Sequence, residues 1–84
     1  MSNLNETLNE RGNRYGDFRD HALIAQDLQD VMRPPEGWNR LSPHQKQALT
    51  VIADKIARIL NGDPNYADNW HDIQGYARLV EERL

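Results

Sequence analysis

The fold is decided by residues 42–64, which read SPHQKQALTVIADKIARILNGDP. Ser42, Pro43 and Gln45 are a strong helix start, because serine caps a helix, proline suits its first position and glutamine completes a capping box. Apolar residues then recur every three or four positions, as expected for one stripe of a helix from Pro43 to about Leu60. The stripe contains Leu49, Ile52, Ala53, Ile56, Ile59 and Leu60.

After this helix the chain turns and begins another. Asn61-Gly62 predicts a left-handed helix stop, Asp63-Pro64 predicts a turn, and Asn65 is placed to cap a last helix that runs to about Arg83. The two helices are therefore expected to pack as an antiparallel hairpin. The face of the last helix that we expect to meet the core carries Tyr66, Trp70, Ile73, Ala77 and Val80, with Tyr76 beside them.

Two helical segments are predicted before the hairpin. Residues 17–32 have helical periodicity, with Asp17 as the cap, and Pro34-Pro35 ends them. Residues 2–10 predict a short helix capped by Ser2 or Asn3, and residues 11–16, with two glycines, predict a loop. The expected fold is all-α, a small helical bundle in one domain over residues 1–84, where residues 1–16 form a short helix and loop and residues 17–84 a three-helix core.

Length and charge restrict the classes of function. A chain of 84 residues buries too small a core for a deep private pocket, so we expect a ligand site between helices or subunits, and a homo-oligomer. The formal charge of −3 lacks the basic excess of nucleic-acid binders, so no nucleic-acid partner is expected. The absence of cysteine excludes zinc fingers and disulfide frameworks. No apolar run is long enough to span a membrane, so we expect a cytoplasmic protein without a membrane partner.

Charged residues gather on the hairpin. Lys55 lies about 90° from the centre of its helix's apolar stripe, and Asp72 about 100° from the centre of the next, so both lie at the shoulder where helices meet water. They are expected to form either a salt bridge or the wall of a site for an anionic ligand. Asp54 and Arg58 are spaced as an ion pair on the outward face of their helix.

A second pair of charges has the same sign. Asp68 and Asp72 lie one helical turn apart, a spacing at which two carboxylates can ligate Mg²⁺. The alternative is that Asp68 interacts with the positive end of the helix dipole while Asp72 pairs with Lys55 or an arginine. Gly75 and Leu79 share that face, and a glycine inside a helix predicts the close approach of another helix, a second subunit or a ligand.

The remaining candidates lie before the hairpin. The Arg11 to Tyr15 segment is suited to hold a phosphate and stack a base, although an ordinary exposed turn has the same composition. His21 falls on an apolar helix face, where it is expected to be either a core histidine or a catalytic one. No catalytic serine triad, zinc-binding histidine motif or phosphate-cradling glycine motif occurs.

Three segments carry a resemblance to known proteins, namely Arg11-Gly12-Asn13-Arg14-Tyr15-Gly16-Asp17, Asp54-Lys55-Ile56-Ala57-Arg58-Ile59 and Asp68-Asn69-Trp70-His71-Asp72-Ile73-Gln74-Gly75-Tyr76-Ala77. Together they resemble a family of small phage and prophage proteins, similar to the MazG-like all-α nucleotide pyrophosphohydrolases. The Lys-x-x-Arg and Asp-x-x-x-Asp pattern is also similar to a nucleotide-modification-associated domain.

The resemblance implies a helical bundle that oligomerises and, in the enzymes, holds Mg²⁺ on acidic motifs of two helices. The metal then activates water against the α–β phosphate linkage of a nucleoside triphosphate. This chain departs from that pattern, because the helix that should carry the acidic triplet has one carboxylate, Asp54, beside Lys55 and Arg58. The last helix keeps Asp68 and Asp72.

Two hypotheses follow. In the first, the chain is a phage-type MazG-like module that binds a nucleoside triphosphate through Lys55, Arg58, Arg14 and Tyr15. Asp68 and Asp72 then hold Mg²⁺, with pyrophosphohydrolase activity if water is activated there. In the second, it is a non-catalytic phage or prophage interaction protein whose helical surface docks on a host protein.

Overall fold

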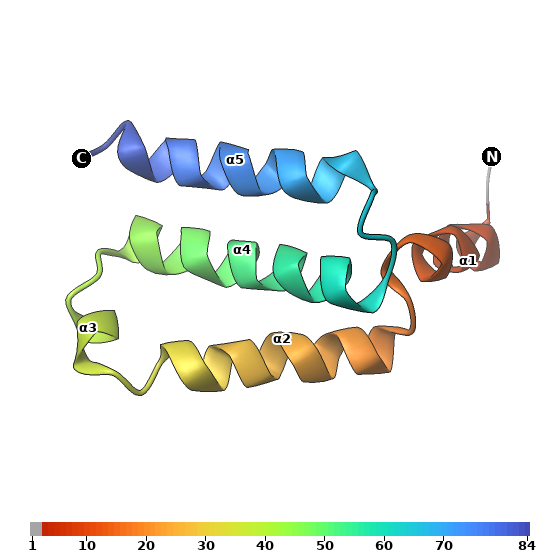
Figure 1. The fold of residues 1–84 in the computed structure, drawn as a ribbon, viewed down its shortest axis with the longest axis horizontal. Coiled ribbons are helices and arrows are strands. Elements are labelled where there is room, and N and C mark those ends of the chain that lie inside the picture. Colours follow the sequence, from red (N-terminus) through yellow and green to blue (C-terminus); the bar gives the residue numbers. More distant parts are fainter. Residues whose placement is uncertain (1–2) are drawn as a thin grey trace.

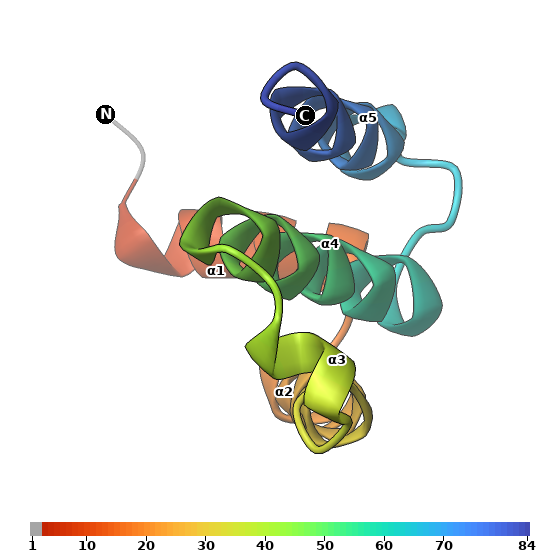
Figure 2. The same ribbon diagram turned by 90° about the vertical axis from the view of Figure 1, so that its left-hand side faces the viewer.

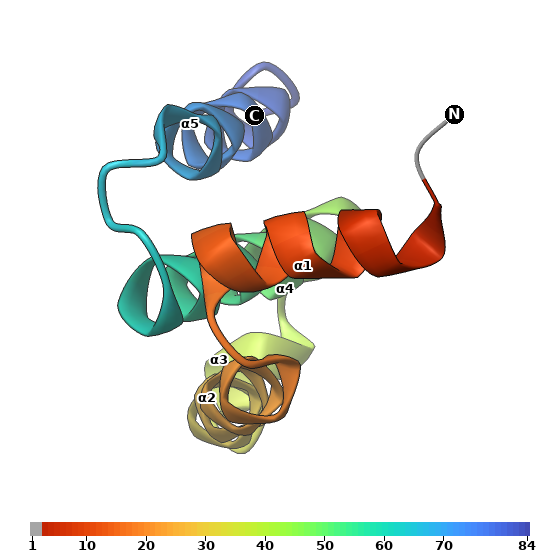
Figure 3. The same ribbon diagram turned by 90° about the vertical axis from the view of Figure 1, so that its right-hand side faces the viewer.

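The computed structural model describes residues 3–84, which form five helices and no strand (Figure 1). The helices are α1 (Leu4–Tyr15), α2 (Phe18–Met32), α3 (Glu36–Asn39), α4 (Pro43–Asn61) and α5 (Ala67–Glu81). The predicted all-α class is confirmed. Helices α2, α4 and α5 form one layer with α4 in the middle, so α4 packs against both of the others (Figures 1 and 2). Helix α1 lies against one end of this layer and projects to one side of it (Figure 3).

The start of α4 is the predicted capping box. The backbone N–H and the hydroxyl of Ser42 both donate to Oε1 of Gln45, at 2.9 and 2.8 Å. The predicted hairpin is also present, since α5 packs antiparallel to α4. The left-handed stop at Asn61-Gly62 is wrong, because Asn61 is still helical and Gly62 has a φ of −134°. Among the described residues only Gly16 has a positive φ.

Helix α2 has the predicted bounds, and Asp17 caps it by accepting the backbone N–H of Arg19 at 2.7 Å. The short helix α3 was not predicted in the connection to α4. None of the helices within residues 3–84 combines the length and the hydrophobicity that a membrane span requires.

Helix α1 extends through the segment predicted as a loop, so the loop at residues 11–15 is wrong. Asn3 provides the predicted cap, accepting the backbone N–H of Glu6 at 2.8 Å. Ser2, the alternative cap, lies outside the described residues. Gly12 is helical despite its low propensity, because Arg14 forms an ion pair with Glu10 one turn away and also contacts the rest of the protein.

The packed face of α5 is rotated from the predicted one. Trp70 is 52 % exposed and Ala77 is exposed, whereas Asn69 is fully buried. Trp70 stays on the surface because its indole N–H donates to the carbonyl of Pro64 at 2.8 Å. Asn65 does not cap α5, since its backbone N–H instead donates to Oδ1 of Asp63 at 2.9 Å and the N-cap position is Tyr66.

The core between the helices is thin. Its buried apolar side chains, within the described residues, are Ala48, Ala53 and Ala57 of α4. These small side chains let α2 and α5 approach α4 from opposite sides, but they bury little apolar surface. The larger apolar side chains of the predicted α4 stripe are therefore turned partly to the surface.

Candidate functional site

Two turns of the chain interlock where α1 meets the end of α4. The side-chain amide of Asn61 donates to the carbonyls of Tyr15 and Asp17, at 2.8 and 2.9 Å. The backbone N–H of Asp63 donates to the carbonyl of Arg14 at 2.7 Å. A Cβ atom on Gly16 would overlap the carbonyl of Asn61, and one on Gly62 would overlap the carbonyl of Arg14. The two glycines thus permit the contact that fixes α1 on the protein.

This junction brings together a cluster of two arginines and two tyrosines, which we call the Arg–Tyr cluster: Arg14, Tyr15, Arg58 and Tyr66. The guanidinium carbon of Arg14 lies 4.7 Å from the centre of the Tyr66 ring, and that of Arg58 lies 4.6 Å from the centre of the Tyr15 ring. The two rings meet edge to face, with their centres 6.1 Å apart. Such cation–π and aromatic contacts stabilise the cluster and orient both guanidinium groups.

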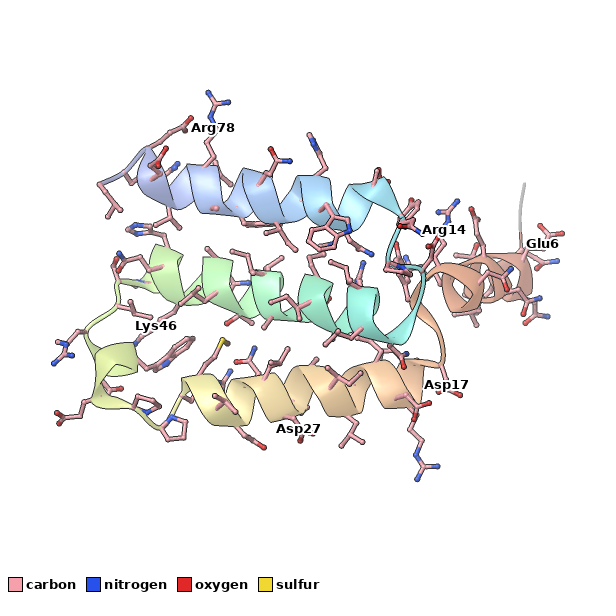
Figure 4. The ribbon with its side chains drawn as sticks, in the orientation of Figure 1. Glu6, Arg14, Asp17, Asp27, Lys46 and Arg78 are labelled. Carbon is pink, nitrogen blue, oxygen red and sulfur yellow. The ribbon has the colours of Figure 1, made fainter. Side chains whose placement is uncertain are left out.

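Tyr66 connects the cluster to α5. Its hydroxyl accepts a hydrogen bond from Nη1 of Arg14 at 3.1 Å and donates one to Oδ2 of Asp68 at 2.8 Å. The hydrogen bond to Asp68 raises the pKa of Tyr66 above its ordinary value of 10.0, with a further contribution from burial, while Arg14 opposes the shift. Figure 4 shows Arg14 at the end of α1, beside the connection that leads into α5.

Arg58 connects the cluster to α2. Its Nε lies 3.1 Å from Oδ2 of Asp54, which is an ion-pair distance, but the N–H is not directed at that oxygen and has no acceptor in the described structure. Oδ1 of Asp54 lies 2.9 Å from Nε2 of His21. The predicted pair of Asp54 and Arg58 is present, but its predicted outward position is wrong because Asp54 faces α2. His21 is buried, as expected of a core histidine.

A groove lies beside Arg58, between α1, the start of α2 and the C-terminal half of α4. We call it the α1 groove; its volume is about 560 Å³. The residues that line it are Leu8, Arg11, Gly12, Tyr15, Gly16, Asp17, Phe18, His21 and Arg58. It offers two guanidinium groups, an imidazole and two aromatic rings, against one carboxylate. This volume and lining suit a small ligand with an anionic group and a flat ring.

The residues predicted to bind a nucleotide fall in two places. Tyr15 and Arg58 line the α1 groove, and Arg14 lies behind it in the Arg–Tyr cluster. Lys55 lies elsewhere, with its ammonium 3.0 Å from Oδ2 of Asp72 between α4 and α5. The predicted salt bridge between Lys55 and Asp72 is therefore confirmed.

Asp68 and Asp72, the predicted metal ligands, each have a partner. Asp68 accepts the hydroxyl of Tyr66, and Asp72 pairs with the ammonium of Lys55. Within residues 3–84 no group of three or more histidine, aspartate or glutamate side chains is arranged to hold a metal ion. A Mg²⁺ ion on Asp72 would have to displace Lys55, so these residues as arranged do not fit a metal centre.

One groove residue, Phe18, and one residue of the Arg–Tyr cluster, Tyr66, were missed as site residues. Phe18 belongs to the periodic apolar positions of residues 17–32, which suggest the core, but it is 77 % exposed at the groove. Tyr66 was assigned to the core face of α5, but it belongs to the Arg–Tyr cluster. Both lie at the beginning of a helix next to a turn, where the packed face cannot be read from periodicity alone.

Neither the curated proteins nor the solved structures gave a match to this chain. A family model described as "Domain of unknown function (DUF6378)" matches residues 1–84, which is the whole chain. The protein therefore belongs to the DUF6378 family.

Proposed function

We propose that this protein binds a nucleoside phosphate in the α1 groove. The observation that carries the proposal is the presence of two guanidinium groups, Arg11 and Arg58, beside the aromatic rings of Phe18 and Tyr15 in one groove of about 560 Å³. Guanidinium groups bind phosphate oxygens through charge-assisted hydrogen bonds, and aromatic rings stack nucleobases. The resemblance to MazG-like nucleotide pyrophosphohydrolases supports the same class of ligand.

The phosphate end of the proposed site is formed by Arg11 and Arg58. Arg11 is exposed and forms no ion pair in the described structure, so its guanidinium is available to a ligand. Arg58 is held in place by Tyr15 and Asp54, and its Nε–H lacks an acceptor. The whole chain has a formal charge of −3, so these two cations make the groove more positive than the rest of the protein.

The base end is formed by Phe18. Arg58 covers one face of Tyr15, and the Tyr15 ring also contacts Tyr66, whereas most of Phe18 is open to solvent. A base stacked on Phe18 would gain about 1–3 kcal/mol, as base–aromatic contacts do in single-stranded nucleic-acid binders. Such stacking is tolerant of base identity, so the proposal specifies a nucleotide but no particular base.

Hydrolysis is not part of this proposal. The groove contains one carboxylate, Asp17, which already caps α2. The magnesium-dependent reaction expected from Asp68 and Asp72 stays a prediction, because both carboxylates have partners outside the groove. A cytoplasmic location agrees with the proposal, since a cysteine-free chain fits a reducing compartment where nucleotides are abundant.

Calorimetric titration with nucleoside mono-, di- and triphosphates, with and without Mg²⁺, tests the proposal. Arg11→Gln should weaken binding by about 1.5–3 kcal/mol, the strength of a hydrogen bond to a charged group. Phe18→Ala should weaken binding of nucleotides but not of inorganic phosphate. Both side chains are exposed, so neither change should unfold the protein.

Matched controls lie on α2. Arg19→Gln makes the same charge change as Arg11→Gln at an exposed position outside the groove, and Leu23→Ala removes an exposed apolar side chain, as Phe18→Ala does. Neither control should alter nucleotide affinity. Equal effects of Arg11→Gln and Arg19→Gln would contradict a site in the groove, and no binding by the unmodified protein would remove the proposal.

A second candidate is a protein interaction on the outer side of α5. A Cβ atom added to Gly75 would have nothing within 4 Å, and the neighbouring Leu79 is 48 % exposed. The two residues line a shallow cavity of about 390 Å³ together with Arg78 and Glu82. A backbone open at this glycine suits a close-packed helix of a host protein. Gly75→Leu should abolish capture of such a partner while leaving nucleotide binding unchanged.

A further inference from the structure

The side of α4 that faces away from the α1 groove is apolar. At about 100° per residue, Leu49, Ile56 and Leu60 lie within about 40° of one another around α4. Arg58, which lines the groove, lies about 180° from their centre. The sequence predicted that these residues would pack in the core, but in the described structure all three are exposed.

The neighbouring helices continue this apolar surface. Lys55 lies about 60° from the groove residue Arg58 around α4, so Lys55 and its partner Asp72 lie on the groove side of the layer. Trp70 lies about 160° from Asp72 around α5. Trp70 therefore lies on the side of the layer away from the groove. In α2, Val31 lies about 140° from the groove residue Phe18, which places it on that same side. We call the apolar residues of this surface the uncharged face: Ile24, Val31, Leu49, Ile56, Leu60, Trp70 and Ala77. The carboxylates of Asp20 and Glu81 lie at its border, about 20° from Val31 and Trp70 around their helices.

No helix of the described chain covers the uncharged face, although the turn at Pro64 contacts Trp70 at its edge. Figures 2 and 3 show α1 on one side of the layer and no helix over the other side. Val31 is 72 % exposed and Leu60 is 66 % exposed. Large apolar patches of this kind are rare on monomeric proteins and mark interaction surfaces.

The spacing along α4 suits another helix as the covering element. Leu49, Ile56 and Leu60 follow one another at intervals of seven and four residues, which fits the apolar seam of packed helix pairs, and Ala53 between them is already buried in this chain. The seam runs along the middle helix of the layer, so it lies at the centre of the uncharged face.

The surface area of the chain indicates how large the covering element is. The chain exposes 6337 Å², whereas a compact monomer of 9.8 kDa is expected to expose about 5,200 Å². Its radius of gyration is 14.5 Å, against about 12 Å for a compact domain of this length. Part of the excess belongs to α1, but an excess of about 1,100 Å² is more than the roughly 800 Å² that each partner buries in a standard interface.

We propose that a second copy of this chain covers the uncharged face, in a twofold-symmetric dimer with the α4 helices packed against each other. In such an interface each residue patch meets itself. The apolar centre of this patch pairs with itself without bringing charges together, even though both chains carry a charge of −3, whereas Asp20 and Glu81 at its border are exposed. The cavity at Gly75 is a poorer choice for this contact, because Asp72, Arg78 and Glu82 in its lining would have to lose water on contact.

The test is the mass of the full chain in solution, measured by sedimentation velocity over a dilution series. The unmodified protein should have twice the chain mass of 9.8 kDa. Leu60→Glu and Val31→Glu should each weaken the dimer by at least about 30-fold, because each places a carboxylate in an apolar contact. Circular dichroism should show that both variants stay helical, since both side chains are largely exposed.

Leu79→Glu on the outer side of α5 and Leu23→Glu on the outer side of α2 are the matched controls, and both should remain dimers. A monomeric unmodified protein at about 100 µM would overturn the proposal, since a homodimer of this interface size is stable there. An assembly that Leu79→Glu dissociates and Leu60→Glu does not would also overturn it. If Leu60→Glu loses its helix content, Val31→Glu decides the outcome. The result is independent of nucleotide binding, which depends on the opposite side of the layer.

Discussion

Arg58 stacks on Tyr15, with its guanidinium carbon 4.6 Å from the ring centre, and this contact joins the middle helix of the layer to the end of α1. Arg58→Lys should lower the free energy of unfolding by about 0.5–1 kcal/mol, because an ammonium cannot stack as the planar guanidinium does. Denaturant unfolding of Arg58→Lys, Tyr15→Leu and the double variant measures the coupling. Strictly additive losses would contradict a direct contact.

Gly62 and Gly75 differ in what surrounds them, so alanine should have opposite effects at the two positions. Gly62→Ala should lower the free energy of unfolding by about 2–4 kcal/mol, because the new Cβ overlaps the backbone of Arg14. Gly75→Ala should raise it by about 0.5–1 kcal/mol, because the site is helical and open. Thermal unfolding of the two variants gives both values. A stabilising Gly62→Ala would mean that the junction is not closed in solution.

Tyr66 should make the free energy of unfolding depend on pH in the alkaline range. Its pKa in the folded protein is raised above 10.0, chiefly by the hydrogen bond to Asp68. The hydrogen bond therefore contributes fully below pH 10.0, and its contribution is lost as the pH rises through the raised pKa. Absorbance titration at alkaline pH should show one late tyrosine, and Tyr66→Phe should remove that step. If Tyr66→Phe leaves the late step of the titration in place, Tyr66 and Asp68 are not hydrogen-bonded in solution.

Asp72 should be structural rather than part of a ligand site. Asp72→Asn should lower the free energy of unfolding by about 1 kcal/mol, because the largely buried Lys55 loses its ionic partner. Nucleotide affinity in the presence of Mg²⁺ should not change, and calorimetric titration measures it. A folded Asp72→Asn protein that no longer binds nucleotide would instead support the magnesium hypothesis.

Local signals in the sequence predicted most of the helices. The caps at Asn3, Asp17 and Ser42 and the break at Pro34-Pro35 fixed the ends of three helices, because each depends on chemistry within a few residues. The salt bridge between Lys55 and Asp72 was also predictable, since both residues lie at the shoulders of adjacent antiparallel helices. The family-specific magnesium and nucleotide hypotheses are not tested by the fold.

The failures concern contacts between distant segments. Gly62 is not left-handed, because its role is to admit the backbone of Arg14 from α1, which no local rule describes. Residues 11–15 are helical because Arg14 and Tyr15 are stabilised by Tyr66 and Arg58, far along the chain. The rotation of α5 could not be predicted, because Trp70 and Ala77 are apolar but face outward. Periodicity identifies an apolar stripe without saying whether the same chain covers it.

The junction between α1 and the end of α4 also has a consequence for the order of folding. Asn61 reaches Tyr15 across 46 residues of sequence, whereas the α4–α5 hairpin closes over a turn of a few residues. Because closing a longer loop costs more chain entropy, the hairpin should form first and α1 should dock last. The α1 groove then comes into existence only at the final step, so a partly folded chain lacks it.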